Sequence, residues 1–328
     1  MNVPLVHTVR VAPDPEVLFR SMEGVAWPLW LDSTPGGGTL GRHSFMACDP
    51  FRVLRGRAGS SEWLVPGGSE AGTRDPLTEL GEALARFRIS GPPDLPPFCG
   101  GAAGYFGYEL AADLERIPAA AHRDLALPDL EVALYDLVVG WDLEGGECWI
   151  CSTGLPERGA AARAKAEARL AEARRWLSGG PAPDLHALGD TSTLKLPRTE
   201  PPPTFAVPGS SVRSTFSPDD YRRAVRRAIE LIRAGDVYQV NLSQRFEASV
   251  KDDLPGLYRT LRTASPAPFG SCFETRDGAI LSTSPERFLS LTSQGEVETR
   301  PIKGTRPRHS DPGLDSEFAT ELAASVKD

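Results

Sequence analysis

Residues 234–246 read AGDVYQVNLSQRF, and this stretch decides the fold expected for the second half of the chain. Successive side chains of a strand lie on opposite faces, which predicts an apolar face of Tyr238, Val240, Leu242 and Phe246. The opposite face would carry Gln239, Asn241, Ser243 and Arg245. Amides, a hydroxyl and one guanidinium suit a hydrogen-bonding pocket better than a solvated face, which usually carries Lys, Glu and Thr. A half-buried surface strand would alternate in the same way, so both interpretations stay open.

A helix is expected immediately before this stretch. Ser217 can accept hydrogen bonds from the free N–H groups of a first turn, and Pro218 is tolerated at the first helical position. An apolar stripe follows at helical spacing: Val225, Ile229 and Ile232. Gly235 can adopt the left-handed conformation that ends a helix. The sequence therefore predicts a helix that leads directly into a strand.

Residues 284–288 read SPERF and follow a strand predicted over residues 279–283. Glu286 lies beside a turn that proline forces at the end of this strand. A carboxyl group in a partly buried turn can have a raised pKa and act as a general acid. The alternative is an ordinary surface ion pair between Glu286 and Arg287.

Residues 300–308 read RPIKGTRPR and follow a second run that alternates as a strand does. Its predicted face contains Val297, Thr299, Pro301 and Lys303. Buried on such a face, Lys303 would lose its proton near neutral pH and become a nucleophile, and Gly304 would let a ligand approach the backbone closely. A basic turn that grips a carboxylate, or a solvated cluster of charges, is the alternative.

The bulk properties exclude several classes of protein. The chain has 328 residues and a net charge of -8, whereas a protein that coats nucleic acid or a membrane surface needs a basic face. No leader segment or apolar run long enough to span a bilayer is apparent, so a cytoplasmic location is expected. The five cysteines are scattered, which fits a reducing compartment. Cys148 and Cys151 form a CxxC motif. We interpret them as two residues of an ordinary strand rather than as a redox-active or metal-binding pair.

Three regions are expected along the chain. Residues 1–178 resemble one unit of mixed strands and helices, with a helix that begins at Asp75-Pro76 and a long surface helix over 157–177. Residues 179–213 are rich in proline without periodicity, which is typical of a linker. Residues 214–328 would form the second unit.

Taken together and in order, these motifs resemble those of the chorismate-binding enzymes. The resemblance rests on the stretches 234–246, 284–286 and 301–305, on GRHSF at 41–45 with Asp49-Pro50, and on the glycine–aromatic run at 100–109. The glycines of that last run could suggest a phosphate-binding loop, but no Lys-Ser/Thr follows them. Without the resemblance, this run would indicate only tight packing of strands and aromatic rings. The resemblance implies an α/β (α+β) fold like that of anthranilate synthase component I. Two stacked, largely antiparallel sheets would carry outer helices, incomplete at the C-terminus.

Two positions indicate a branch of the family. Isochorismate and salicylate synthases have a lysine where this chain has Gln239, and anthranilate synthases usually have alanine where it has Lys303. The chain is therefore most similar to aminodeoxychorismate synthase component I. The resemblance implies that the Lys303 amine adds to chorismate C2, that Glu286 is the general acid, and that Gly304 and Thr305 contact the substrate. Anthranilate synthase component I is the nearest alternative.

The resemblance also implies partners. Ammonia would come from a glutamine amidotransferase subunit, and Mg²⁺ would neutralise a chorismate carboxylate. The metal-binding glutamates of the family would lie beyond Asp328, so no metal ligand is expected in this chain, and the 328 residues alone are expected to be inactive and unstable. A non-catalytic fragment that keeps ligand or partner binding is the remaining alternative.

A tryptophan pocket is a further expectation from the resemblance. Ser33 matches the serine of the pocket in these enzymes, and Pro266-Ala267-Pro268 match its other wall. Arg42, Ser44 and Phe45 of the GRHSF motif complete the expected set.

Overall fold

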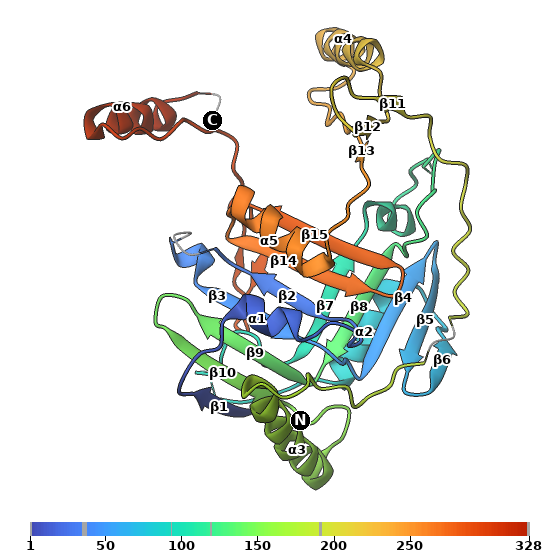
Figure 1. Cartoon of the computed structure of the whole chain (residues 1–328). Helices are drawn as coiled ribbons and strands as arrows, with labels where there is room; N and C mark the ends of the chain where they lie inside the picture. The colour runs from blue at the N-terminus through green and yellow to red at the C-terminus, as the bar shows by residue number, and fades with distance from the viewer. Residues whose placement is uncertain (1, 35–37, 93, 119, 190–191, 327–328) are drawn as a thin grey trace.

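The computed structural model of the protein describes residues 2–34, 38–92, 94–118, 120–189 and 192–326. Within these ranges, two large sheets of antiparallel strands form the body of the molecule (Figure 1). The larger sheet contains, in spatial order, β1 (Leu5–Val9), β10 (Glu147–Ser152), β9 (Leu137–Asp142), β3 (His43–Ala47), β2 (Leu29–Asp32), β14 (Phe269–Thr275) and β15 (Gly278–Ser284). The smaller sheet contains β6 (Gly68–Ala71), β5 (Ser60–Val65), β4 (Arg52–Arg57), β8 (Leu130–Tyr135) and β7 (Gly101–Phe106).

The sequence of each strand fits its place in these layers. Every residue of β8 and β9 is buried, as their near-continuous apolar runs require of strands covered on both faces. The edge strand β1 instead alternates between half-buried and exposed side chains. A core lies between the two sheets, because one apolar cluster takes Leu29 and Phe273 from the larger sheet and Val53, Leu64 and Ala133 from the smaller one. The expected architecture of two stacked, largely antiparallel sheets is confirmed.

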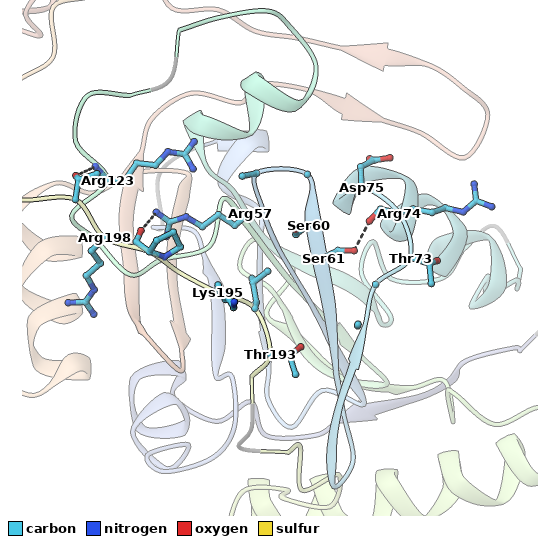
Figure 2. Close-up of a pocket in the computed structure, with 17 residues that line it drawn as sticks. Arg57, Ser60, Ser61, Thr73, Arg74, Asp75, Arg123, Thr193, Lys195 and Arg198 are labelled. Carbon is cyan, nitrogen blue, oxygen red and sulfur yellow. Dashed lines mark hydrogen bonds between the residues drawn. The ribbon is translucent and has the colours of Figure 1, made fainter.

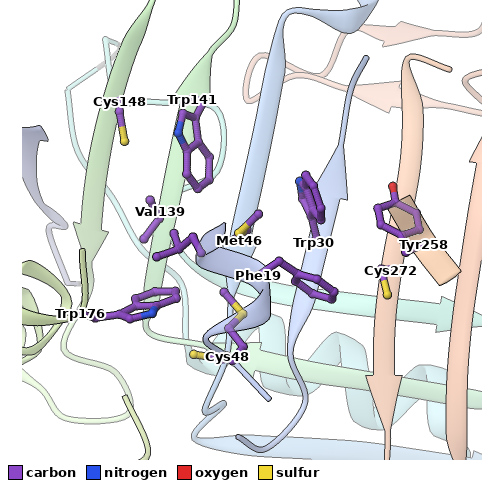
Figure 3. Close-up of a cluster of buried hydrophobic side chains, with 12 residues drawn as sticks. Phe19, Trp30, Met46, Cys48, Val139, Trp141, Cys148, Trp176, Tyr258 and Cys272 are labelled. Atoms are coloured by element: carbon purple, nitrogen blue, oxygen red, sulfur yellow. The ribbon is translucent and has the colours of Figure 1, made fainter. Parts of the chain in front are cut away.

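Helices cover the outer faces of both sheets. On the larger sheet, α1 (Pro15–Arg20), α3 (Gly159–Leu177) and α5 (Leu254–Ala264) contribute Phe19, Trp176 and Tyr258 to one buried cluster around Trp30 and Met46 (Figure 3). On the smaller sheet, α2 (Pro76–Arg86) packs Leu80 and Ala83 into a second cluster. Short 3₁₀ turns lie at η1 (Gly38–Gly41) and η2 (Tyr108–Asp113).

The helix ends follow local sequence signals. Asp75 accepts hydrogen bonds from the N–H groups of Leu77 and Thr78, and so caps α2 as expected. Ser217 caps α4 (Pro218–Ala234), and Gly235 ends it with a φ of 84°. The long helix predicted over 157–177 is confirmed as α3.

The chain beyond α4 contains several short elements. A small sheet joins β11 (Phe205–Ala206), β12 (Arg213–Ser214) and β13 (Phe246–Glu247), a hairpin joins β16 (Ser290–Leu291) and β17 (Val297–Glu298), and α6 (Pro312–Ala323) comes last. Figure 1 shows α4 and α6 standing away from the two large sheets. Neither helix has a buried residue among those described, and the apolar stripe of α4 is open: Ile229 is 43% and Ile232 42% exposed.

Two expected strands are much shorter than the alternation predicted. In the run 237–246, only Phe246 belongs to a strand, and in the run 297–303 only Val297 and Glu298 do. Alternation marks which side chains share a face, but a strand also needs a neighbouring strand to pair with. Among the described residues, β12 pairs with β13 only at two positions, and β16 pairs with β17 only at two. The remaining residues of both runs are irregular.

The larger sheet contains strands from both the expected first region (1–178) and the expected last region (214–328). The two are joined where β14 pairs with β2, with Ser271 opposite Leu31. The stretch 179–213 is extended, and carboxylates of the body hold it in place. Asp49 accepts the N–H groups of Leu185 and His186, and Glu62 accepts that of Thr193. The regional boundaries at 178 and 213 stay predictions.

Cys148 and Cys151 lie in β10 and are buried. Burial raises the pKa of the Cys148 thiol to about 12, which does not favour the thiolate that redox or metal chemistry needs. In the described part of the chain, no helix is both long and apolar enough to cross a membrane.

Candidate functional site

The loop after β15 brings Glu286 against the lysine-bearing segment. Ser284, the last residue of β15, accepts the N–H of Glu286 at 3.4 Å and donates to its carbonyl at 3.1 Å, which tightens the turn at Pro285. The chain then forms the β16–β17 hairpin and returns, so that the N–H of Ile302 donates to the Glu286 Oε2 at 3.1 Å. The predicted acid therefore lies beside the residue that precedes Lys303.

A second contact holds the same two segments together. Glu298, in β17, accepts a hydrogen bond from Arg287 at 2.6 Å and another from Arg300 at 2.7 Å. These two arginines keep the pKa of Glu298 below its usual range, so the carboxylate stays charged between them. The surroundings of Glu286 are therefore rich in cations, because Arg287, Arg300 and Lys303 lie on the segments that these contacts join.

Lys303 and Thr305 are exposed, and Gly304 is half-buried. The expectation that Lys303 would be buried on a strand face is not met within the described residues. The reason is structural: β17 ends at Glu298, so the segment that follows has no sheet to bury it. Further along, Arg308 pairs with Asp315 at the start of α6.

Gln239 lies in the irregular segment after α4, where its amide donates to the side chain of Asn241 at 3.2 Å. Arg245, further along the same segment, makes a two-pronged ion pair with Asp124 at 3.0 and 2.8 Å. Among the described residues, no hydrogen bond or ion pair joins this segment to the Glu286 loop. The structure thus brings together Glu286 and the 301–305 segment but leaves Gln239 apart from them.

A cavity of about 410 Å³ lies where the tryptophan pocket was expected. Of the expected residues, Ser33, Phe45 and Pro268 line it. Ser33 donates a hydrogen bond to the carbonyl of Pro268 at 2.7 Å and so joins the two walls. Ala267 is buried behind the cavity, where its carbonyl accepts the N–H of Thr34.

Besides Ala267, three expected residues do not line this cavity. Ser44 is on the opposite face of β3, where its hydroxyl accepts a hydrogen bond from the Trp30 indole at 2.9 Å. Arg42 faces Asp142 instead, through contacts of 2.6 and 3.0 Å. Pro266 is exposed.

Residues outside the expected set also line the cavity: Leu31, Asp32, Leu40, His43, Pro97, Phe269, Gly270, Ser271 and Arg287. Period-two alternation along β3 would have predicted His43 from Phe45, and the two rings stack at 6.0 Å. Arg287 has no such local signal. It lies over the Phe269 ring at 5.3 Å and also binds Glu298, so it joins the cavity to the Glu286 loop.

Burial decides the charges around this cavity. It raises the pKa of Asp32, although Arg262 donates to that carboxylate at 2.7 Å and opposes the shift. Burial also lowers the pKa of His43, which favours the neutral ring. The cavity is lined by Phe45, Phe269 and the neutral His43 ring, which suits a ligand that carries an aromatic ring.

The described residues do not fit a Mg²⁺ site. Within them, no group of three or more His, Cys, Asp or Glu side chains lies close enough to hold a metal ion.

Comparisons with known proteins agree with the motifs. Residues 29–328 match the family model described as chorismate binding enzyme. The chain is 35% identical to aminodeoxychorismate synthase component 1 of Salmonella typhimurium over 99% of its own length and 65% of that protein's. It is 37% identical to the protein of the same name from Klebsiella aerogenes, of which it covers 66%. It thus spans roughly two thirds of the length of these relatives.

Two further similarities point to the related enzyme that makes anthranilate. The chain is 36% identical to anthranilate synthase component 1 of Thermus thermophilus, over 89% of its own length and 57% of that protein's. Its fold resembles the crystal structure of anthranilate synthase component I from Streptococcus pneumoniae, with a TM-score of 0.64 and 26% identity, over 90% of this chain and 59% of that one.

Proposed function

The chain belongs to the chorismate binding enzyme family, and from this premise we propose that it is component I of an aminodeoxychorismate synthase. It would convert chorismate and ammonia to 4-amino-4-deoxychorismate, the precursor of 4-aminobenzoate and folate. The relatives of that name, at 35% and 37% identity over nearly the whole chain, support this assignment. Ammonia would come from a glutamine amidotransferase subunit, as the designation component 1 of those relatives suggests.

The observation that carries the proposal is the contact between Glu286 and the main chain of Ile302, at 3.1 Å. It joins the Glu286 carboxylate to the main chain of the residue that precedes Lys303, and a carboxyl group and an amine are the acid and nucleophile that the proposed reaction would use. An anthranilate synthase would usually have alanine at position 303, so Lys303 favours the aminodeoxychorismate branch.

The two residues would share the chemistry as follows. The Lys303 amine would form a bond to chorismate C2 while the C4 hydroxyl departs, and Glu286 would supply the proton that lets it leave as water. Ammonia would then form a bond to C4, the C2–nitrogen bond to Lys303 would break, and the proton lost by the new C4 ammonium group would return to Glu286. The net reaction consumes chorismate and ammonia and yields the amino product and water, with Lys303 regenerated.

The surrounding groups suit such a substrate. Chorismate carries two carboxylates, and Arg287 and Arg300 lie beside the Glu286 loop. Gly304 would let the substrate approach the backbone, and Thr305 would offer it a hydroxyl group. Gln239 would complete the substrate contacts, which requires its segment to move toward the Glu286 loop.

The cavity of about 410 Å³ is proposed to bind tryptophan. Phe45 and the neutral His43 would contact the indole ring. Occupation of this cavity without turnover would instead support a role in ligand binding alone.

Product analysis tests the proposed activity. The complete protein, expressed from its whole gene, is incubated with chorismate, ammonium and magnesium salts, and the products are separated by liquid chromatography. We expect 4-amino-4-deoxychorismate, which a lyase converts to 4-aminobenzoate. The 36% identity to an anthranilate synthase makes anthranilate the second candidate product, and its fluorescence would identify it.

A further inference from the structure

A second, larger cavity of about 950 Å³ lies on the smaller sheet, far in sequence from the residues discussed above. Four segments surround it: the turn between β4 and β5, the loop that leads into α2, the loop before β8 at Arg123, and residues 193–199 of the proline-rich stretch (Figure 2). None of its lining residues belongs to the Glu286 loop or to the 410 Å³ cavity. It is therefore a separate site.

The cavity has a strong excess of positive charge on a protein whose net charge is -8. Its lining residues include five cations: Arg57, Arg74, Arg123, Lys195 and Arg198. Asp75 is the one carboxylate among the described lining residues, and it already accepts two N–H groups as the cap of α2.

Arg57 is the least expected member of this group. Its side chain belongs to a residue that is only 5% exposed, yet it donates to two backbone carbonyls, those of Leu127 at 3.2 Å and Pro197 at 3.1 Å. Within the described part of the chain it has no acidic partner. A buried cation without a counter-ion is costly, whereas buried charges in proteins are normally paired. An anion in the cavity would supply the missing charge.

Of the other four cations at the cavity, two already contact a carboxylate and two contact none within the described chain. Arg123 contacts Asp129 at 3.2 Å, and Arg74 contacts the exposed Glu82 at 3.3 Å. Lys195 and Arg198 have no hydrogen-bond or ion-pair partner among the described residues, although both lie at the cavity. Three cations from two segments, the buried Arg57 and the pair Lys195 and Arg198, are thus available to one ligand.

The chemistry of the lining narrows the class of ligand. Ser60, Thr73 and Thr193 add hydroxyl groups, but the described lining residues include no aromatic side chain on which a base could stack. Each phosphate group carries nearly two negative charges at neutral pH and several strong acceptors, and it matches the forked donors of arginine. We infer that this cavity binds a small, non-aromatic molecule that carries at least two phosphate groups.

The site has a short connection to the Gln239 segment. Arg123 lines the cavity, and its neighbour Asp124 holds Arg245 through the two-pronged ion pair described above. Arg123 is also joined to the 193–199 segment, because its N–H donates to Thr199 at 2.7 Å. A ligand here therefore contacts an element that anchors part of the proposed active site.

Isothermal titration calorimetry of the complete protein with pyrophosphate tests the inference. We expect saturable binding of one pyrophosphate per chain that weakens as salt is added. Lys195→Ala and Arg198→Ala should each weaken it about tenfold, since each removes a contact to a charged group. Both side chains are unpaired in the described structure, so neither substitution should affect folding. Arg57→Met should weaken binding further, and its folding is checked by circular dichroism.

Arg222→Ala is the matched control. Arg222 is an exposed arginine of α4, distant from the cavity lining, whose contact is with Asp219. Its removal should leave the affinity for pyrophosphate unchanged. Absence of saturable binding at millimolar pyrophosphate, or unchanged affinity in the Lys195 and Arg198 variants, would overturn the inference. Tighter binding of citrate than of pyrophosphate would overturn the assignment of phosphate.

Discussion

The main-chain N–H of Ile302 donates a hydrogen bond to the carboxylate of Glu286 over 3.1 Å. This contact positions the predicted acid by the backbone rather than by another mobile side chain. It also joins the loop after β15 to the segment that carries Lys303. The proposed chemistry depends on these two segments staying together.

Glu286→Gln should remove the proton that the leaving hydroxyl needs while keeping the acceptor for Ile302. We expect kcat to fall by roughly 10²–10⁴-fold, with a much smaller change in KM. Steady-state consumption of chorismate by the complete protein measures both constants. Glu296→Gln is the control, because Glu296 is exposed in the β16–β17 turn and its side chain makes no contact among the described residues. Equal loss of activity in both variants would refute the role given to Glu286.

Lys303→Met should abolish formation of 4-amino-4-deoxychorismate, because no amine would remain to add to C2. Lys303→Arg should not restore it, since a guanidinium stays protonated at neutral pH. Lys251→Met, at an exposed lysine outside the site, should behave as the unmodified protein. Near-normal turnover in the Lys303→Met protein would rule out covalent catalysis by this residue.

Phe45→Leu and Ser44→Ala should differ in their effect on tryptophan binding, although the residues are adjacent. Phe45 lines the 410 Å³ cavity, whereas the Ser44 hydroxyl lies behind it against Trp30. Calorimetry with tryptophan should show about a tenfold weaker affinity for Phe45→Leu, from the lost aromatic contact. It should show a change of less than about threefold for Ser44→Ala. The reverse order would contradict the proposed position of the ligand.

Arg55→Met should destabilise the fold by roughly 3–5 kcal/mol. Arg55 is 1% exposed and donates to Glu62 and Glu131 at 3.2 Å each, and to Asp277 in the β14–β15 turn. Its loss leaves buried carboxylates without a cation, so urea unfolding at pH 7 should shift strongly.

The stability of the Arg55→Met variant should depend on pH because of Glu131. Burial raises the pKa of Glu131 in the folded protein, and Arg55 opposes that shift. Without Arg55 the carboxyl would take up a proton on folding, which favours the folded state at lower pH. The stability deficit of Arg55→Met should therefore shrink as the pH falls from 7 toward 5. A deficit that does not change with pH would contradict this explanation.

Arg42→Ala should make the protein less stable at neutral pH, and this deficit should shrink in acid. The hydrogen bonds from Arg42 hold the pKa of Asp142 well below its usual range. A carboxyl with a lowered folded pKa stabilises the fold fully above its unfolded pKa, about 4, and this contribution is lost progressively as the pH falls from there through the lower folded pKa. Urea midpoints of both proteins at pH 7 and pH 3.5 measure the difference. A difference that grows in acid would contradict the sign.

Local signals in the sequence predicted several elements well. Asp75, Ser217 and Gly235 act within one helical turn, so the ends of α2 and α4 followed from neighbouring residues alone. Pairing between distant strands has no such signal. Nothing in the local sequence places Ser271 opposite Leu31, and this pairing brings the β14–β15 hairpin into the larger sheet.

The same distinction applies to the sites. The motif that contains Glu286 and the one that contains Lys303 were recognisable separately, and the β16–β17 hairpin explains why they meet. The strand expected around Gln239 did not form beyond its last residues, because alternation does not supply a pairing partner. The 950 Å³ cavity was not predictable, since Arg57 and Lys195 come from separate segments that meet only in the folded chain.

Trapping of the covalent intermediate tests the central claim most directly. The complete protein is mixed with chorismate in the absence of ammonia, quenched with acid, and analysed by mass spectrometry with peptide mapping. The account predicts an increase equal to the mass of chorismate less one water, on the peptide that contains Lys303, and no such increase in Lys303→Met. Rapid conversion of chorismate after ammonia is added, with no modified Lys303 peptide at any time before it, would contradict the account.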